Sequence, residues 1–196
     1  MTHFSACLRT QSRPGAALVA LIFSLQGISG AHFNPAVSLA AALQKNLAWR
    51  QFPVYVAAQI VGAFVGVIAA HLMFGLSLFS ASTKVRAGGA QVFSEFVATL
   101  GLLLVIEGSS RSRFRAVPFA VAAYITAAYW FTSSTSFANP AVTLARSLSD
   151  TFVGIRPVDA PAFILAQVAA SIVGTLLIIW LMPHAKPDSD QGKRNV

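Results

Sequence analysis

The stretch AHFNPAVSLA, residues 31–40, places an Asn-Pro-Ala triplet between two short apolar runs, and FANPAVTLA, residues 137–145, repeats it. Pro suits the first position of a helix, because the N–H that it lacks would have no partner there, and Asn is among the best N-caps. Each stretch therefore predicts a helix that begins at its triplet. Asn46 and Asp150 are expected to close these helices after roughly three turns, about 15–18 Å, which is too short to cross a membrane.

The rest of the chain is apolar enough to lie in a bilayer. Hydrophobic residues make up 56% of the 196 residues and charged residues 10%, against about 25% charged residues in soluble proteins. Two runs without charge, 52–74 and 160–183, exceed the ~20 residues that cross a hydrocarbon core. Shorter apolar runs lie at 15–28, 90–106 and 116–132. We therefore predict an all-α polytopic membrane protein.

The two triplets belong to a larger internal repeat. Alignment of Asn34 with Asn139 superimposes NPAVSLA on NPAVTLA, and each copy precedes a span that begins with Pro and carries Gln six residues later, at Gln59 and Gln167. Such duplication predicts an inverted or parallel structural repeat. Helices of half length occur at membrane depth only where they are buried in protein or line a water-filled cavity, so we expect both short helices inside the bundle.

The repeat is incomplete at its front. In the second half of the chain two spans precede the triplet, whereas in the first half only one does. The expected organisation is an N-terminal segment at 1–14 in place of the first span, a membrane domain at 15–183 with half-repeats at 15–75 and 90–183, and a polar cytoplasmic tail at 184–196.

The apolar run 15–28 is shorter than a straight span, so its helix is expected to extend back into the first 14 residues. Two other interpretations of the front stay open. Residues 1–31 have the basic start, apolar middle and small residues of a secretory signal, and the chain could also be a shortened gene product.

The net charge of +8 indicates membrane orientation rather than a nucleic-acid partner, because the basic residues fall between spans, where cytoplasmic loops are enriched in Lys and Arg. Arg111, Arg113 and Arg115 share one short connection, and Lys45 and Arg50 lie two spans earlier on the same side. That side is predicted to be the cytoplasmic side of the cell membrane.

No catalytic or metal-binding arrangement is visible. The single cysteine, Cys7, excludes an intramolecular disulfide and a cysteine-only metal site. No His/Cys/Asp/Glu cluster has metal-ligand spacing and no nucleophile–base pair can be recognised. We therefore expect no metal, no cofactor and no enzyme activity.

The predicted chemistry is passive conduction of small neutral solutes. Two short helices that enter from opposite faces would meet N-terminus to N-terminus, and their partial positive charges would oppose cations and protons. Asn34 and Asn139 could donate hydrogen bonds to a passing oxygen, while GISGAHF and SSTSFA, the segments before them, would expose backbone carbonyls.

ISGAHFNPAVSLA and SFANPAVTLARSL resemble the paired signatures (Asn34, Pro35, Ala36 and Asn139, Pro140, Ala141) of the aquaporin, or major intrinsic protein, family, and the similarity runs from about residue 15 to 183. The resemblance implies about five spanning helices, two re-entrant half-helices and a homotetramer. GGAQVFSEFVATLGLLLVI resembles the family's fourth helix, which implies that Glu95 accepts hydrogen bonds from the loop before Asn139.

FANPAVTLARSLSDTFVGI is most similar to bacterial aquaglyceroporin-type channels associated with arsenic resistance. That similarity implies water, glycerol-like polyols, and neutral metalloid or methylated arsenic species as solutes, and a bacterial inner membrane as the location. By offset from Asn139 it also implies a selectivity filter that includes Ala127, Ser136 and Val142. Val142 stands where water-selective relatives carry Arg, so a wider and less polar filter is expected.

Other interpretations stay open beside these. Arg146 could restore part of the lost charge at the outer vestibule or simply bond a loop carbonyl, and His32 could act as a gate or pack below the half-helix. His71 is expected at the membrane interface. The whole chain could instead be a truncated, non-conducting family member, or a coupled secondary transporter, although Glu95 is its one clear acidic residue within a span.

Overall fold

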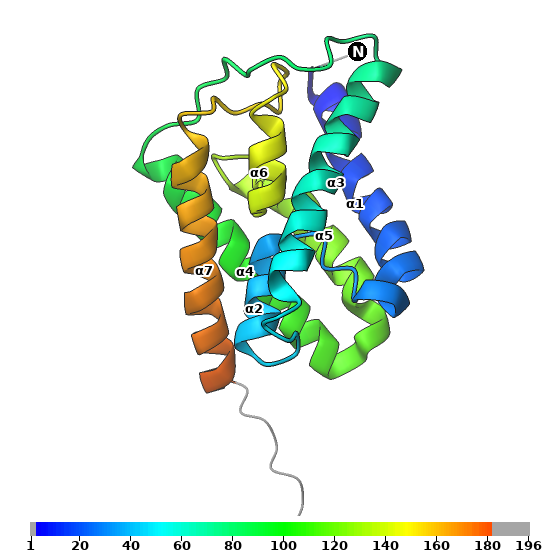
Figure 1. Ribbon diagram of the computed structural model, residues 1–196, viewed down its shortest axis with the longest axis vertical. Helices are drawn as coiled ribbons and strands as arrows, with labels where there is room; N and C mark the ends of the chain where they lie inside the picture. Colours follow the sequence, from blue (N-terminus) through cyan, green and yellow to red (C-terminus); the bar gives the residue numbers. More distant parts are fainter. Residues whose placement is uncertain (1–2, 182–196) are drawn as a thin grey trace, which may run out of the picture.

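The computed structural model describes residues 3–181, with side chains for 15–112 and 115–181, and every regular element in this part of the chain is a helix (Figure 1). In order, the elements are α1 (His3–Ser29), α2 (Pro35–Leu43), α3 (Phe52–Met73), α4 (Gly89–Arg113), the 3-10 helix η1 (Phe114–Ala116), α5 (Val117–Phe131), α6 (Pro140–Arg146) and α7 (Ala160–Leu181).

Three of the described helices, α3, α4 and α7, are long and apolar enough to cross a membrane, and α1 and α5 contribute the shorter apolar segments Gly15–Ser29 and Val117–Phe131. These are the five predicted spans. α1 continues through residue 14 without a break, so the N-terminal segment and the first apolar run form one helix.

The half-helices are shorter than the sequence predicts. α2 ends at Leu43 and α6 at Arg146, not at Asn46 and Asp150. Lys45 takes a left-handed conformation with φ of 65°, which stops α2. Beyond α6, the carbonyls of residues 147 and 148 accept hydrogen bonds from the backbone N–H groups of 82 and 80, so the loop 74–88 competes with the next helical turn.

The helices pack with the two-fold pattern of an inverted repeat (Figure 1). α2 and α6 each pack on both α3 and α7. Each half-helix is thus held by the span that follows it and by the corresponding span of the other repeat. α1 and α5 pack against each other, and α4 packs on α5 and α7. No described helix takes the place beside α1 and α3 that α4 takes beside α5 and α7.

The two long helices that follow the half-helices differ greatly in burial for this reason. His71 is the only buried residue of α3, all of which the structure describes, whereas α7 buries nine residues. The unequal burial of two repeat-related helices agrees with the predicted absence of one span from the described part of the first repeat.

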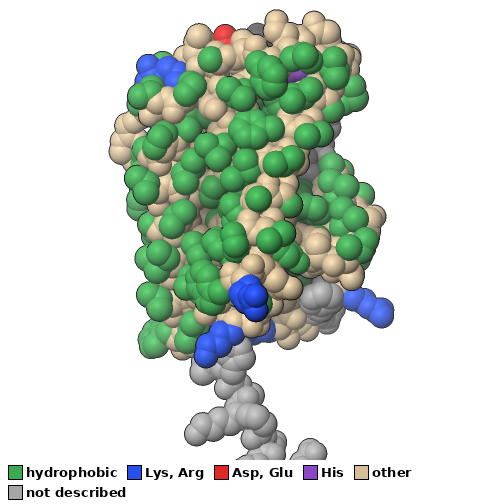
Figure 2. All heavy atoms as spheres, viewed as in Figure 1, with side chains coloured by type: hydrophobic (Ala, Val, Ile, Leu, Met, Phe, Trp, Pro, Cys, Tyr) green, Lys and Arg blue, Asp and Glu red, His purple; other side chains and the backbone are tan. Residues whose placement is uncertain are grey.

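The connections divide into two ends. The connection 44–51, η1 and the end of α7 lie at one end, which we call the inner end, and the loops 74–88 and 147–159 lie at the other, the outer end (Figure 1). Figure 2 shows Lys and Arg side chains at both ends, more of them at the inner end, and a largely apolar flank between the ends. This distribution fits an inside-positive orientation.

Candidate pore and filter

The two half-helices are joined where their triplets meet. Nδ2 of Asn34 donates to the carbonyl of Ala138 at 2.7 Å, and Nδ2 of Asn139 donates to the carbonyl of Phe33 at 2.9 Å. Each Asn thus bonds the loop of the opposite repeat. An amide nitrogen has two hydrogens, so each Asn keeps one donor for another partner.

The same two Asn residues cap their own helices. Oδ1 of Asn34 accepts from the backbone N–H of Ala36 at 2.9 Å. Oδ1 of Asn139 accepts from Ala141 and Val142 at 3.0 and 3.3 Å. Both residues have extended backbones and Pro follows each, as an N-cap requires. The positive ends of two helices therefore point at one small region.

The loops before the triplets share an unusual backbone. The residues one and three positions before each Asn have positive φ: 50° at Ala31 and Phe33, and 46° and 47° at Ser136 and Ala138. None of these is Gly, so each costs about 1–3 kcal/mol and persists only because the surroundings hold it. The match between the loops extends the repeat from sequence to backbone conformation.

Glu95 holds the second loop. Its Oε1 accepts from the backbone N–H of Phe137 at 2.8 Å, and its Oε2 accepts from Ala138 at 2.7 Å and from Nε2 of Gln167 at 2.7 Å. Gln167 also donates to Oγ1 of Thr143 on α6 at 3.0 Å. The carboxylate is fully buried, and three charge-assisted bonds offset the cost of burying it.

The first repeat contains only part of this clamp. Nε2 of Gln59 donates to Oγ of Ser38 at 2.9 Å, and Nδ1 of His32 lies 3.1 Å from the same hydroxyl. Oε1 of Gln59 is buried without a partner among the described residues. His32 is half-buried beside α2 and also lines the cavity described next.

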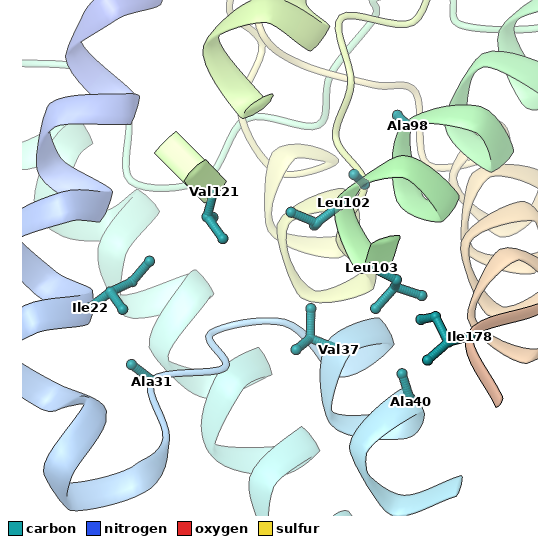
Figure 3. Packing of buried hydrophobic residues seen from close by; sticks show 10 residues of the cluster. Ile22, Ala31, Val37, Ala40, Ala98, Leu102, Leu103, Val121 and Ile178 are labelled. Atoms are coloured by element: carbon teal, nitrogen blue, oxygen red, sulfur yellow. The ribbon is translucent and has the colours of Figure 1, made fainter. Parts of the chain in front are cut away.

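A cavity of about 520 Å³ lies between the half-helices and the surrounding spans, a size that suits a small solute. Its wall is mostly apolar and comes from α1, α2, α4, α5, α6, α7 and the loops before the triplets. Figure 3 shows apolar side chains of this wall: Ile22, Ala31, Val37, Ala40, Leu102, Leu103, Val121 and Ile178. Both triplet Asn residues also line it. Polar residues line the cavity toward the inner end as well, among them Gln44, Asn46, Glu107 and Ser110, so the polar groups of the wall lie at the junction of the half-helices and on both sides of it.

Two of the three predicted filter residues reach this cavity. Ser136 and Val142 line it, but Ala127 is exposed and lies outside the lining. The cavity-facing side of α5 carries Val117, Val121, Ile125 and Tyr129. These residues recur every four positions and share one helix face, which Ala127 does not. Ile125 and Tyr129, two residues before and two after Ala127, thus line the cavity, and Ala127 does not.

Arg86 is a structural residue that the sequence did not single out. Its Nε donates to the carbonyl of Gly154 at 2.7 Å, Nη1 to that of Ser134 at 2.8 Å, and Nη2 to that of Phe152 at 3.3 Å. The guanidinium also lies 4.9 Å from the centre of the Phe137 ring. Arg86 thus links the outer loops to the loop before the second triplet, which we call the pore loop. Its acceptors are backbone carbonyls, which no sequence motif marks.

The outer loops carry an ion pair that fixes the start of α7. Nε and Nη2 of Arg156 donate to the carboxylate of Asp159, each at 3.0 Å, and the backbone N–H of Arg86 donates to it at 2.9 Å. The hydrogen bonds from Arg156, followed by the one from Arg86, lower the pKa of Asp159.

His71 lies in the last turn of α3, near the outer end, and is buried there. Its Nε2 lies 2.9 Å from Oγ of Ser149 and its Nδ1 lies 3.2 Å from the carbonyl of Leu78. The two outer loops fold over the end of α3 and cover the ring, which a reading of the span alone does not reveal.

Comparison with known proteins identifies the family. The major intrinsic protein family model matches residues 7–116, more than half of the chain. The chain belongs to the major intrinsic protein family. This membership places it among multi-pass membrane channels and not among enzymes, in agreement with its apolar helices.

Individual family members support the same assignment. The chain is 52% identical to aquaglyceroporin AqpS of Rhizobium meliloti over 173 residues, which are 88% of this chain and 74% of that protein. It is 33% identical to aquaporin NIP1-1 of Oryza sativa over 82% of the chain and 57% of the relative. It is also 33% identical to the glycerol uptake facilitator protein of Bacillus subtilis, over 51% of the chain and 40% of that relative.

Proposed function

We propose that this family member is a passive transmembrane channel for small uncharged solutes. The observation that carries the proposal is the junction of two half-helix N-termini, joined by reciprocal hydrogen bonds from Asn34 and Asn139, both of which line a cavity of about 520 Å³. A passing oxygen can accept the second amide hydrogen of each Asn, while the positive helix ends repel cations and protons.

The proposed solutes are water, glycerol-like polyols, and neutral metalloid or methylated arsenic species. Val142 lines the cavity where Arg would narrow and charge it, and an apolar wall suits the carbon side of a polyol. The name of the relative AqpS, an aquaglyceroporin, supports a solute larger than water. The proposed location is a bacterial inner membrane and the proposed assembly is a homotetramer.

A second candidate is a member that inserts without conducting. It is favoured by the exposure of α3, on which Val54, Val61, Val65 and Leu72 are each more than half exposed. Coupled secondary transport has less support, because Glu95 uses both carboxylate oxygens on the pore loop and Gln167 and is not free to bind a coupling ion.

Substitution of Val142 by Trp tests the conduction path. The indole would fill the cavity beside the junction, so glycerol-driven swelling of proteoliposomes, followed by stopped-flow light scattering, should fall to the rate of protein-free liposomes. Val173→Trp is the matched control, because Val173 faces outward on α7 with 45% exposure and should leave the rate unchanged. Equal rates for both variants and the unmodified chain would place the path elsewhere.

A further inference from the structure

Arg146 lies one turn after Val142 on α6 but reaches back to the level of the pore loop. Side chains of a helix tilt toward its N-terminus, and residues four apart share one face. Accordingly the guanidinium carbon of Arg146 lies 4.4 Å from the centre of the Phe137 ring, in the loop before the triplet. Arg146 and Val142 line the same cavity.

The guanidinium of Arg146 has donors that the fold does not use. Its Nη1 is buried and has no hydrogen-bond partner among the described residues, and Nη2 makes only a long contact of 3.5 Å to the Tyr129 hydroxyl. Arg86 differs, since three of its guanidinium nitrogens donate to carbonyls. Of two arginines beside Phe137, one is committed to structure and the other is available to a solute.

Two more polar groups lie at the same place. The hydroxyl of Ser136 is buried without a partner among the described residues, and both Ser136 and Tyr129 line the cavity with Arg146. A buried unpaired polar atom is costly. Two such atoms, Nη1 of Arg146 and the Ser136 hydroxyl, lie beside the Tyr129 hydroxyl around one cavity. They point to a bound polar molecule with oxygen atoms, which can accept from Nη1 and bond both hydroxyls.

We propose that Arg146 is the specificity-determining cation of this pore and forms, with Ser136 and Tyr129, a subsite for oxygen-bearing neutral solutes. Two observations carry the proposal: the guanidinium of Arg146 reaches the Phe137 ring, and its Nη1 has no partner among the described residues. The proposal rests on the proposed channel function. Val142 carries no charge at the filter position, so we assign the exclusion of cations there to Arg146. This effect adds to the repulsion of cations by the half-helix N-termini.

The test compares urea with guanidinium, which have nearly the same planar shape but differ in charge. Entry of each into proteoliposomes is followed by stopped-flow light scattering at concentrations too low to denature protein, with glycerol as a second neutral reference. The variants are Arg146→Gln, which removes the charge, and Arg146→Lys, which keeps it. Lys84→Gln is the control, since Lys84 is an exposed cation of the outer loop outside the cavity lining.

The readout is the ratio of guanidinium entry to neutral-solute entry, which does not depend on how much protein is folded. We expect Arg146→Gln to raise this ratio about tenfold, equivalent to about 1.4 kcal/mol in the barrier, while Arg146→Lys and Lys84→Gln keep the ratio of the unmodified chain. An unchanged ratio in Arg146→Gln overturns the inference, because the half-helix ends then suffice. If the unmodified chain passes no neutral solute, the channel function itself fails.

Discussion

At the scale of single residues, the pore is held by a few buried polar groups whose partners are far away in the sequence. The triplets predict the capping role of Asn34 and Asn139, because the signal is local. Glu95 was expected at the pore loop only through family resemblance, and its hydrogen bonds to Phe137 and Ala138 match that expectation. Arg86 could not be found, because its partners are backbone carbonyls 48 to 68 residues away.

Replacement of Glu95 by Gln should unfold the second pore loop. Gln presents an NH₂ group where one carboxylate oxygen accepts hydrogen bonds, so a backbone N–H or Gln167 is left facing a donor. Hydrogen bonds to charged groups contribute about 1.5–3 kcal/mol each, so we expect a loss of about 2–4 kcal/mol in unfolding free energy, measured as thermal unfolding in detergent.

Glu107→Gln is the control for this change. Glu107 pairs with Arg111 on the same helix at 2.6 Å, and partly exposed pairs of this kind contribute about 0–1 kcal/mol. A loss in Glu95→Gln no larger than that in Glu107→Gln would mean that the carboxylate does not hold the loop.

At the scale of helices, sequence pattern predicts where elements begin better than where they end. Pro35 and Pro140 start the half-helices as expected. α6 ends earlier than expected because loop 74–88 binds the carbonyls that follow it, a tertiary effect, and α2 ends before Lys45, which takes a left-handed conformation. Likewise, Ala127 was expected in the filter because of its distance along the chain from Asn139. That distance gives a position along α5 but not the face that α5 turns toward the cavity. The packing of α5 against α1 and α4 decides that face.

The close approach of α1 and α5 depends on Gly15. A Cβ added there would lie 3.1 Å from the carbonyl oxygen of Ala122 and closer still to the Thr126 hydroxyl. Gly15→Ala should therefore separate the helices and lower the unfolding free energy by about 1–3 kcal/mol, measured by thermal unfolding in detergent.

Gly62→Ala on α3 provides the opposite case, because nothing lies within 4 Å of the added methyl group. Alanine is favoured over glycine in a helix by about 0.5–1 kcal/mol, so this variant should be as stable as the unmodified chain or more so. Equal destabilisation by both changes would contradict the packing of α1 on α5.

The outer loops should depend on pH through Asp159. Hydrogen bonds from Arg156 and Arg86 lower its pKa in the folded chain below the ordinary 3.8. The stability it contributes is therefore fully present above pH 3.8 and is lost as the pH falls through the lowered value. Thermal unfolding between pH 7 and pH 3 should show this loss in the unmodified chain and a shallower one in Asp159→Asn. Identical pH profiles would show that Asp159 makes no such contribution.

At the scale of the molecule, two repeats meet around one cavity, but only the second has all of its walls among the described residues. Five apolar helices and two half-helices follow from the sequence because apolar runs and Asn-Pro-Ala triplets are local signals. The open flank of α3, where His71 alone is buried, also follows from the span count. The polar outer end of the cavity could not be predicted from the sequence, because Arg146, Tyr129 and Ser136 come together only in the folded chain.

The most direct test of the central claim is glycerol entry into proteoliposomes that contain this 196-residue chain, measured by stopped-flow light scattering beside protein-free liposomes. We predict that glycerol equilibrates much faster with the protein, and that water does as well. Equal rates with and without correctly inserted protein would contradict it, and the joined half-helices would then be a folded but closed structure.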